Sequence, residues 1–324
     1  MSKVKHVIVK SDEHGQRLDR WLKKQLPKTP FGLLQKIIRT GQLRVDGKRV
    51  KADTKLSEGQ DVRLPPVETH YSDEYKIREG DKEFMESLVV YDDGDLIIFN
   101  KPYGLASQGG SNIHRHMDGM LEVFKNRKGV RPKLLHRLDK ETSGLLMCAR
   151  ELKTVQNMGR VLKNRNIRKY YWGITHNVPE TNSGTIYGAL AKGVGRQKER
   201  MILDEENGLK AQTEFSVVDR LGDDAALISF WPRTGRTHQI RVHSADALDC
   251  PILCDQKYGG SSLDGFELSD RLHLQAYRII FPNPNKKNHM LDISIPIADD
   301  LKQTCDALGF HPDKNFDPFE DVEV

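Results

Sequence analysis

The segment 134–144, LLHRLDKETSG, holds the charges of this chain that are best placed to do chemistry. Asp139 lies between Arg137 and Lys140, and short apolar runs flank the segment on both sides. A carboxylate beside two cations stays ionised, which suits a nucleophile. It equally suits a salt bridge that holds a turn. These residues alone favour the salt bridge.

A second reactive segment is WPRTGRTHQIRVH, residues 231–243. Thr237 is a good N-cap, so the pattern predicts a helix from this residue to the region of Pro251. A helix N-terminus behind arginines is a favourable seat for an anion, either a phosphate or the carboxylate of Asp139. His238 and His243 are five residues apart and do not share a helical face, unlike the histidine pair of a zinc protease. The segment therefore predicts no metal site.

A third candidate segment is IIFNKPYGLASQGGS, residues 97–111. Lys101 and Pro102 follow a predicted strand, and three glycines come after them. No Gly-Lys-Ser/Thr sequence follows, so this is not a phosphate-binding loop of the nucleotide-binding type. Taken alone, the segment predicts only a turn after a strand.

The composition is that of an ordinary globular protein. The chain has 324 residues, of which 37% are hydrophobic and 30% charged. It contains no apolar run of the ~20 residues that a membrane helix needs, and its first residues do not form a secretory signal. Two of the four cysteines, Cys250 and Cys254, are four residues apart without a second ligand pair. We therefore expect reduced cysteines in a cytoplasmic protein, with no metal and no cofactor.

The charge is distributed unevenly along the chain. Residues 1–65 hold 16 Lys and Arg against 7 Asp and Glu, a net charge of +9. Residues 299–324 hold 2 against 8, a net charge of −6. A basic head of this density indicates a polyanionic partner. The end of this segment, HPDKNFDPFEDVEV (residues 311–324), is expected to be a solvated and partly disordered tail.

The elements of the head predict a compact RNA-binding module. Helical spacing covers residues 17–26 and 31–40, and Gly41 stands where a helix C-terminal glycine belongs. Asp46-Gly47 predicts a hairpin turn, and residues 59–64 form a further strand. A charged surface without a partner is the alternative. The candidate RNA contacts are Arg17, Arg20, Lys36, Arg39 and Arg44.

The remaining elements predict an α+β protein. Residues 66–86 have no sustained period and are interpreted as a linker. From residue 87 to 298 strands in hairpin-like succession predominate, with few helices, which predicts a large mixed, mostly antiparallel sheet. We thus expect four parts: a small α/β RNA-binding domain (1–65), the linker (66–86), a catalytic domain (87–298) and the acidic tail (299–324).

Taken together and in this order, the three segments resemble one family, the RluA-type pseudouridine synthases, and in particular its RluC/RluD branch. HRLDKETSG matches the family signature at every position, TGRTHQIRVH its arginine motif and NKPYGL its lysine-proline motif. RKYYWGI is similar to its tyrosine motif. Residues 15–65 resemble the S-four (S4) domain, an RNA-binding module. The resemblance covers residues 15–298 and outweighs the preference for a salt bridge.

The resemblance implies that the protein isomerises uridine in RNA to pseudouridine, without metal or cofactor. Asp139 would be the nucleophile after the uridine is flipped out, and Arg236 would pair with it. Tyr171 would stack on the base, although its neighbour Tyr170 is an alternative. Arg137 would fill the space that the base leaves. Further RNA contacts are expected from Lys101, His238, Arg241 and the basic run Arg160, Lys163, Arg165, Arg168 and Lys169.

The appended head favours large-subunit (23S) ribosomal RNA or a pre-ribosomal particle as the substrate, and transfer RNA is the alternative. Two other classes compete with the synthase. A non-catalytic RNA-binding ribosome-assembly factor would explain the basic head but not the three motifs together. A metal-dependent RNA hydrolase using His238, His243 and Asp139 would be abolished by chelators. We expect a monomer.

Overall fold

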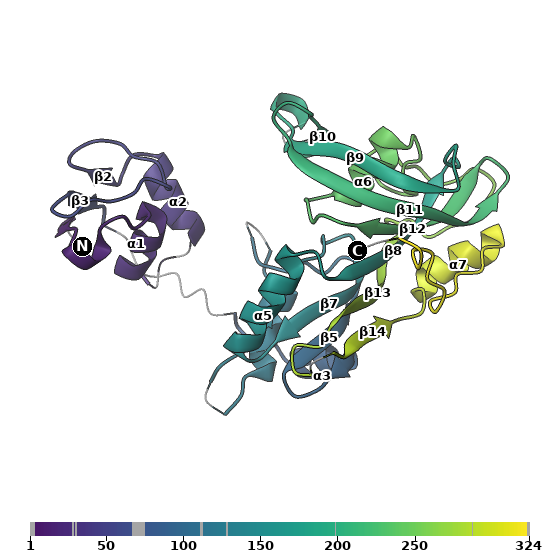
Figure 1. Ribbon diagram of the computed structural model, residues 1–324, viewed down its shortest axis with the longest axis horizontal. Helices are drawn as coiled ribbons and strands as arrows, with labels where there is room; N and C mark the ends of the chain where they lie inside the picture. The colour runs from purple at the N-terminus through teal and green to yellow at the C-terminus, as the bar shows by residue number, and fades with distance from the viewer. Residues whose placement is uncertain are drawn as a thin grey trace. The chain divides into compact units, whose positions relative to one another are not determined.

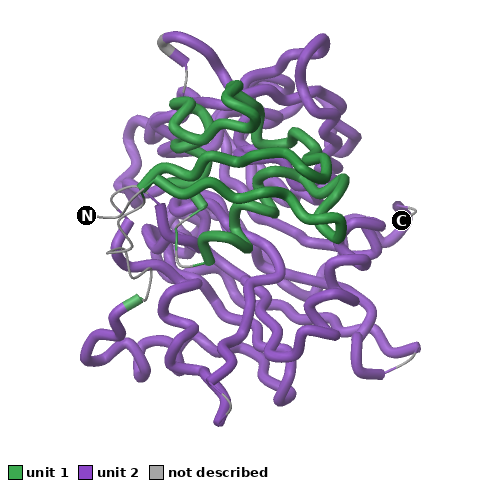
Figure 2. The backbone as a smooth tube through the Cα atoms, turned by 90° about the vertical axis from the view of Figure 1, so that its left-hand side faces the viewer, with its two compact units in different colours: residues 1–75 green, residues 76–324 purple. Residues whose placement is uncertain are grey.

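The structure is a computed structural model that describes residues 4–27, 29, 31–66, 75–110, 113–127, 129–197, 199–286 and 288–322. The chain divides into two compact units, residues Met1–Tyr75 and Lys76–Val324 (Figure 2). The boundary falls inside the segment that was expected to be the linker. The second half of that segment contains a helix, α3 (Asp81–Ser87), so it is not linker throughout.

The small unit consists of a three-stranded antiparallel sheet and two helices. The strands β1 (Lys5–Ile8), β2 (Arg44–Val45) and β3 (Asp61–Leu64) have the order β1-β3-β2, and the helices are α1 (Leu18–Gln25) and α2 (Phe31–Arg39). Its core includes Trp21 and Leu22, which are fully buried. Asp46 and Gly47 have φ angles of 49° and 75°, as a two-residue type I′ turn requires. Both predicted helices and the turn are confirmed, whereas β1 was not predicted.

The large unit is built on a mixed sheet, which has eleven strands in the described part of the chain (Figure 1). Its main path has the order β10-β9-β11-β12-β8-β13-β7-β5-β4, with β14 paired to β13 and β6 to β7. The strands are β4 (Val89–Asp92), β5 (Leu96–Lys101), β6 (Lys133–Leu134), β7 (Ser143–Ala149), β8 (Arg168–His176), β9 (Ser183–Lys192), β10 (Met201–Leu203), β11 (Leu209–Leu221), β12 (Ala225–Pro232), β13 (Leu274–Pro282) and β14 (Met290–Ser294).

A parallel pair between β7 and β13 joins the two halves of this sheet, and the other described pairs are antiparallel. Gly144, in the HRLDKETSG segment, lies in this seam with a φ angle of 111°. A Cβ atom at Gly144 would stand 2.1 Å from the carbonyl oxygen of Ala276. Only glycine lets the two backbones approach this closely. The mixed, mostly antiparallel sheet that the sequence predicts is confirmed.

The helices of the large unit lie against the sheet or at its ends. They are α3, α4 (Met117–Met120), α5 (Leu152–Lys163), α6 (Gln239–Val242) and α7 (Asp299–Leu308). Figure 1 shows α5 along β7, and α6 lies beside β10, β11 and β12. A π-helical turn, His243–Ala247, continues α6. No helix among the described residues is long and apolar enough to cross a membrane.

The acidic C-terminal segment is packed against the sheet through α7 and single apolar residues. In residues 311–322, where a solvated tail was expected, Phe319 is buried and the others are exposed or half-buried, so the expectation fails at Phe319 and holds for the exposed residues around it. Helix α7 buries Leu301 and Leu308, and beyond it Phe310 and Phe319 are 1% and 2% exposed. The ring of Phe319 lies 5.1 Å from that of Tyr170 on β8, centroid to centroid. The acidic residues of this segment alternate with the apolar ones that join the main core.

Candidate active site

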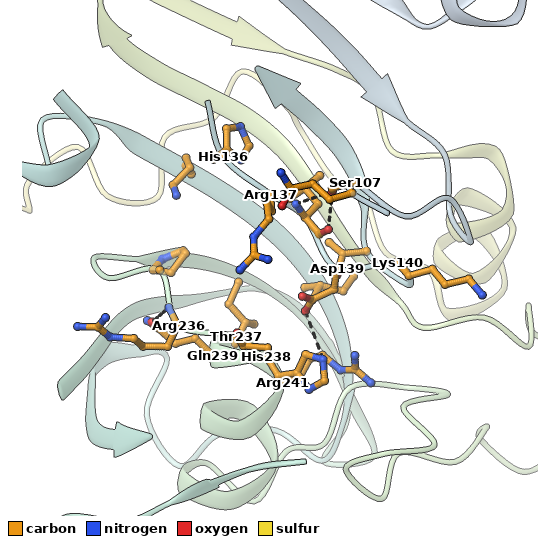
Figure 3. Close-up of a pocket in the computed structure, with 18 of the residues that line it drawn as sticks. Ser107, His136, Arg137, Asp139, Lys140, Arg236, Thr237, His238, Gln239 and Arg241 are labelled. Carbon is orange, nitrogen blue, oxygen red and sulfur yellow. Dashed lines mark hydrogen bonds and ion pairs between the residues drawn. The ribbon is translucent and has the colours of Figure 1, made fainter. Parts of the chain in front are cut away.

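Asp139 lies in the turn that connects β6 to β7, and neighbouring loops fix the backbone of this turn. The hydroxyl of Ser107 donates to the carbonyl of Leu138 at 2.6 Å and accepts from the amide of Leu138 at 3.0 Å. The amide of Thr142 donates to the carbonyl of Asp139 at 3.1 Å. The side chain of Asp139 is one-third exposed. A rigid turn therefore presents a carboxylate that a substrate can reach (Figure 3).

Lys101 supports this turn from below and does not face solvent. It is fully buried, and its ammonium donates to the carbonyls of Pro102, Leu105 and Lys140 at 3.0, 2.8 and 3.3 Å. Burial lowers the pKa of Lys101 to about 7, and the negative charge of Asp139 acts in the opposite direction. The prediction that Lys101 holds RNA phosphates is wrong, because the side chain is enclosed by the protein. Its visible role is to hold the residue after Asp139.

The second half of the site comes from the start of α6. His238 precedes the helix in the left-handed conformation, with a φ of 53°, and its Nε2 atom lies 3.9 Å from Oδ2 of Asp139. The N-cap predicted at Thr237 is therefore one residue too early. Burial lowers the pKa of His238, whereas the charge of Asp139 raises it, so the imidazole is neutral at pH 7.

Arg241 is the buried arginine of the site. Its guanidinium binds both oxygens of Asp255 at 2.6 and 2.7 Å and an oxygen of Glu141 at 2.8 Å. These two carboxylates raise the pKa of Arg241 against the opposing effect of burial, and Asp139 contributes in the same direction. With 2% of its side chain exposed, Arg241 is not placed to bind RNA, contrary to the prediction.

Arg236 was expected to pair with Asp139, and this prediction is wrong. Both residues are described, and the structure shows no ion pair between them. The Nε atom of Arg236 instead donates to the carbonyl of Lys210 at 3.2 Å. The side chain extends away from the carboxylate (Figure 3). The left-handed residue His238 turns the chain so that Arg241 faces inward and Arg236 outward.

The two tyrosines of β8 face opposite sides of the sheet. Tyr170 packs in the main core against Trp231 and Phe319, and its hydroxyl lies 3.3 Å from Asp317. Tyr171 lines the cavity that contains Asp139 and is 8% exposed. Burial, and secondarily the charge of Asp139, raises the pKa of Tyr171, so it remains a phenol at neutral pH. Of the two, Tyr171 is the one that faces Asp139.

The cavity has a volume of about 670 Å³, within the range of small-molecule sites. Three of its donors have no hydrogen-bond or ion-pair partner within the described part of the chain: the guanidinium of Arg137, the ammonium of Lys169 and Nδ1 of His136. The Nε2 atom of His136 accepts from the amide of Met147 at 3.1 Å, so its proton is on Nδ1. Burial lowers the pKa of Lys169. This wall of the cavity offers donors to an electron-rich ligand.

The basic residues predicted in the head lie at the surface of the small unit. Arg20, Lys36 and Arg39 are exposed. Arg17 is exposed too but binds Asp19 at 2.8 Å, and Arg44 donates to the carbonyl of Gly47 at 3.0 Å. Three of the five are therefore free to meet a polyanion.

Sequence reasoning missed Tyr258 and Asp255. Asp255 is the main partner of Arg241, and the hydroxyl of Tyr258 lies 2.7 Å from Nδ1 of His238. Both residues belong to the segment CPILCDQKYGG, residues 250–260, which follows the arginine motif in the sequence. An acidic residue that follows an arginine motif by one short loop is a signal that could have found Asp255. Among the described residues there is no group of His, Cys, Asp and Glu that could hold a metal ion.

Comparisons with known proteins agree with this arrangement. The family model described as RNA pseudouridylate synthase matches residues 95–246, and the S4 domain model matches residues 16–62. A protein named ribosomal large subunit pseudouridine synthase C, from Haemophilus influenzae, is 34% identical over 317 residues, which are 95% of this chain and 96% of that protein. Its namesake from Buchnera aphidicola is 32% identical, over 88% of this chain and 92% of that protein.

A solved structure supports the same assignment for the large unit. Human RNA pseudouridylate synthase domain containing 4 is 25% identical with a TM-score of 0.59, and the match covers 71% of this chain and 97% of that one. The turn that carries Asp139, the buried Arg241 and, apart from Leu274, the residues that line the cavity lie in the region that the family model matches. The chain belongs to the RNA pseudouridylate synthase family and is an RluA-type pseudouridine synthase with an N-terminal S4 domain.

Proposed function

We propose that this synthase isomerises specific uridines of large-subunit (23S) ribosomal RNA, with Asp139 as the nucleophile. The observation that carries the proposal is the rigid turn that presents the carboxylate of Asp139 to a cavity about 670 Å³ in volume. The names of the relatives, which refer to the ribosomal large subunit, support this choice of substrate. The exposed basic residues of the S4 domain supply the attraction to RNA.

The residues around Asp139 divide the work of the isomerisation. The bond from ring nitrogen 1 to the sugar breaks while Asp139 attacks the sugar or removes a proton from it, and the released base turns within the cavity. The sugar then joins ring carbon 5 as its bond to Asp139 breaks or, in the other route, as the proton that Asp139 removed returns to it. Ring carbon 5 loses its proton and nitrogen 1 gains one. The buried cation Arg241 attracts the carboxylate of Asp139 through space, and the imidazole of His238 lies 3.9 Å from it. Tyr171 provides the flat phenol on which the base stacks.

Extrusion of the uridine from the RNA costs a few kcal/mol of stacking. Arg137 fills the space that the extruded uridine leaves in the RNA, because its guanidinium is unpaired, planar and directed into the cavity. Arg236, at the rim, contacts the RNA backbone and not Asp139. We propose further that the enzyme acts as a monomer in the cytoplasm, where ribosomes are assembled.

The test is pseudouridine mapping at single-residue resolution in ribosomal RNA from cells that lack this protein. The cells are complemented with wild type, with Asp139→Asn, or with Asp264→Asn, a surface carboxylate that serves as the matched control. We expect sites that disappear in the deletion and return with wild type and the control but not with Asp139→Asn. If Asp139→Asn restores them, Asp139 is not the nucleophile. If only transfer RNA sites change, the substrate assignment is wrong.

A further inference from the structure

Tyr258 connects the edge of the sheet to the catalytic turn through His238. The amide of Met201, the first residue of β10, donates to the hydroxyl of Tyr258 at 3.0 Å. The same hydroxyl lies 2.7 Å from Nδ1 of His238. The Nε2 atom on the other side of that ring faces Asp139 at 3.9 Å. Two hydrogen bonds thus connect Met201, Tyr258 and His238, and the last step, from His238 to the carboxylate, is an electrostatic contact at 3.9 Å.

The carboxylate at the end of this line decides the direction of its hydrogen bonds. A backbone amide can only donate, so the hydroxyl of Tyr258 accepts from Met201. If this oxygen also accepted from Nδ1 of His238, a lone pair of Nε2 would face the Asp139 carboxylate, so the charge favours a hydroxyl that donates to Nδ1. The neutral imidazole then carries its proton on Nε2 and directs it at Asp139. Burial raises the pKa of Tyr258, which keeps this proton on the phenol.

The rings themselves are held in place. The guanidinium carbons of Arg241 and Arg200 lie 5.2 and 5.6 Å from the ring centroid of Tyr258, within the range of cation–π attraction. The ring of His238 meets that of Tyr258 edge to face at 5.6 Å. His238 itself occupies the left-handed region at a φ of 53°, a conformation that a side chain of this size adopts only where its surroundings impose it.

We propose that Tyr258 is a positioning residue of this synthase: it fixes the tautomer and the orientation of His238, and thereby the rotamer of the Asp139 carboxylate. The proposal rests on the proposed role of Asp139 as the nucleophile. Tyr258 does not line the cavity, so it acts through His238 and does not touch the substrate. Since Met201 anchors the line, the short strand β10 contributes to the site through its backbone.

The test compares Tyr258→Phe with Tyr277→Phe. Tyr277 is also buried, and its hydroxyl contacts Ser229 at 3.2 Å, whereas that of Tyr258 contacts both Met201 and His238; Tyr277 lies in the core cluster away from the cavity. We expect Tyr258→Phe to lower kcat about tenfold on a ribosomal RNA fragment while KM stays within about twofold, a loss of the size of one hydrogen bond. Tyr277→Phe should keep the wild-type kcat.

A second readout follows the ring of His238 directly. Nitrogen-15 NMR of histidine-labelled protein, assigned by the signal lost in His238→Asn, should show the Nε2–H tautomer in wild type and a mixture in Tyr258→Phe. The proposal is overturned if Tyr258→Phe keeps both the tautomer and kcat, or if the control lowers kcat equally. If wild type makes no pseudouridine, the proposed function is refuted instead. The NMR result alone then decides whether Tyr258 fixes the tautomer of His238.

Discussion

Replacing Lys101 by Met tests whether the buried ammonium holds the catalytic turn. The substitution keeps most of the side-chain volume and removes three hydrogen bonds to carbonyls. Hydrogen bonds to a charged group contribute about 1.5–3 kcal/mol each, so the gross loss is about 4–9 kcal/mol. Removing a buried charge offsets part of this loss. The pKa of Lys101 falls from 10.5 to about 7, and this corresponds to about 5 kcal/mol.

The net effect of the Lys101→Met substitution should therefore be a destabilisation of about 2 kcal/mol at pH 6. The difference should grow with pH. Between about pH 7 and pH 10 the unfolded chain holds a proton at Lys101 that the folded chain has released. Wild-type stability consequently rises through this window by up to about 1.4 kcal/mol per pH unit, and the methionine variant has no such gain.

The assay is urea unfolding of both proteins at several pH values from 6 to 9, with Lys153→Met as the control. Lys153 is an exposed lysine on α5, and its replacement should leave stability within about 0.5 kcal/mol of wild type at every pH. Two results would refute the reasoning. One is a Lys101→Met protein at least as stable as wild type at pH 6. The other is a stability difference that does not change between pH 7 and pH 9.

Three further predictions follow from single contacts. Lys169→Met removes an unpaired ammonium from the cavity wall, so KM for the RNA should rise about tenfold while kcat stays within about twofold; an unchanged KM in steady-state kinetics would exclude Lys169 from substrate binding. Arg241→Lys keeps the charge but cannot bind Asp255 through two nitrogens, so chemical unfolding should show a loss of about 3 kcal/mol, and a variant with wild-type stability would contradict that prediction. Phe319→Ala removes a ring that packs against Tyr170, so thermal unfolding should show a free energy of unfolding lowered by about 3 kcal/mol. A clearly smaller loss would mean that the segment around Phe319 is loosely packed.

The parts of the fold that sequence predicts well are those set by local chemistry. The unbroken apolar run of β7 predicts a buried strand, and all of its residues are buried. Asp46-Gly47 predicts a turn because its conformation needs residues that tolerate a positive φ. The motif around Asp139 likewise predicts its location, since the turn and the strand that follows are contiguous in sequence.

The parts that sequence did not predict depend on distant contacts. TGRTHQIR contains two arginines, and the sequence does not show which of them faces the site. Arg241 faces inward because of the left-handed backbone of His238 and because Asp255 is its partner. On α5 the buried positions are Thr154 and Met158, whereas Leu152 is 56% exposed, because the sheet beneath determines the inner face. The net charge of residues 299–324 predicted a solvated tail, but a count of charges does not show the few aromatic residues that attach this segment to the core.

The packing of residues 301–319 also determines the order in which the large unit can mature during synthesis. Leu301, Phe310 and Phe319 belong to the same core as Tyr170 and Trp231, which precede them by 70 to 149 residues. A nascent chain that has emerged only as far as β14 therefore carries an uncovered aromatic surface on the face of β8 opposite Tyr171. The cavity-facing side can assemble before the ribosome releases the chain, but the sheet behind it is completed last. Proteolysis or chaperone binding at that stage would begin at this surface.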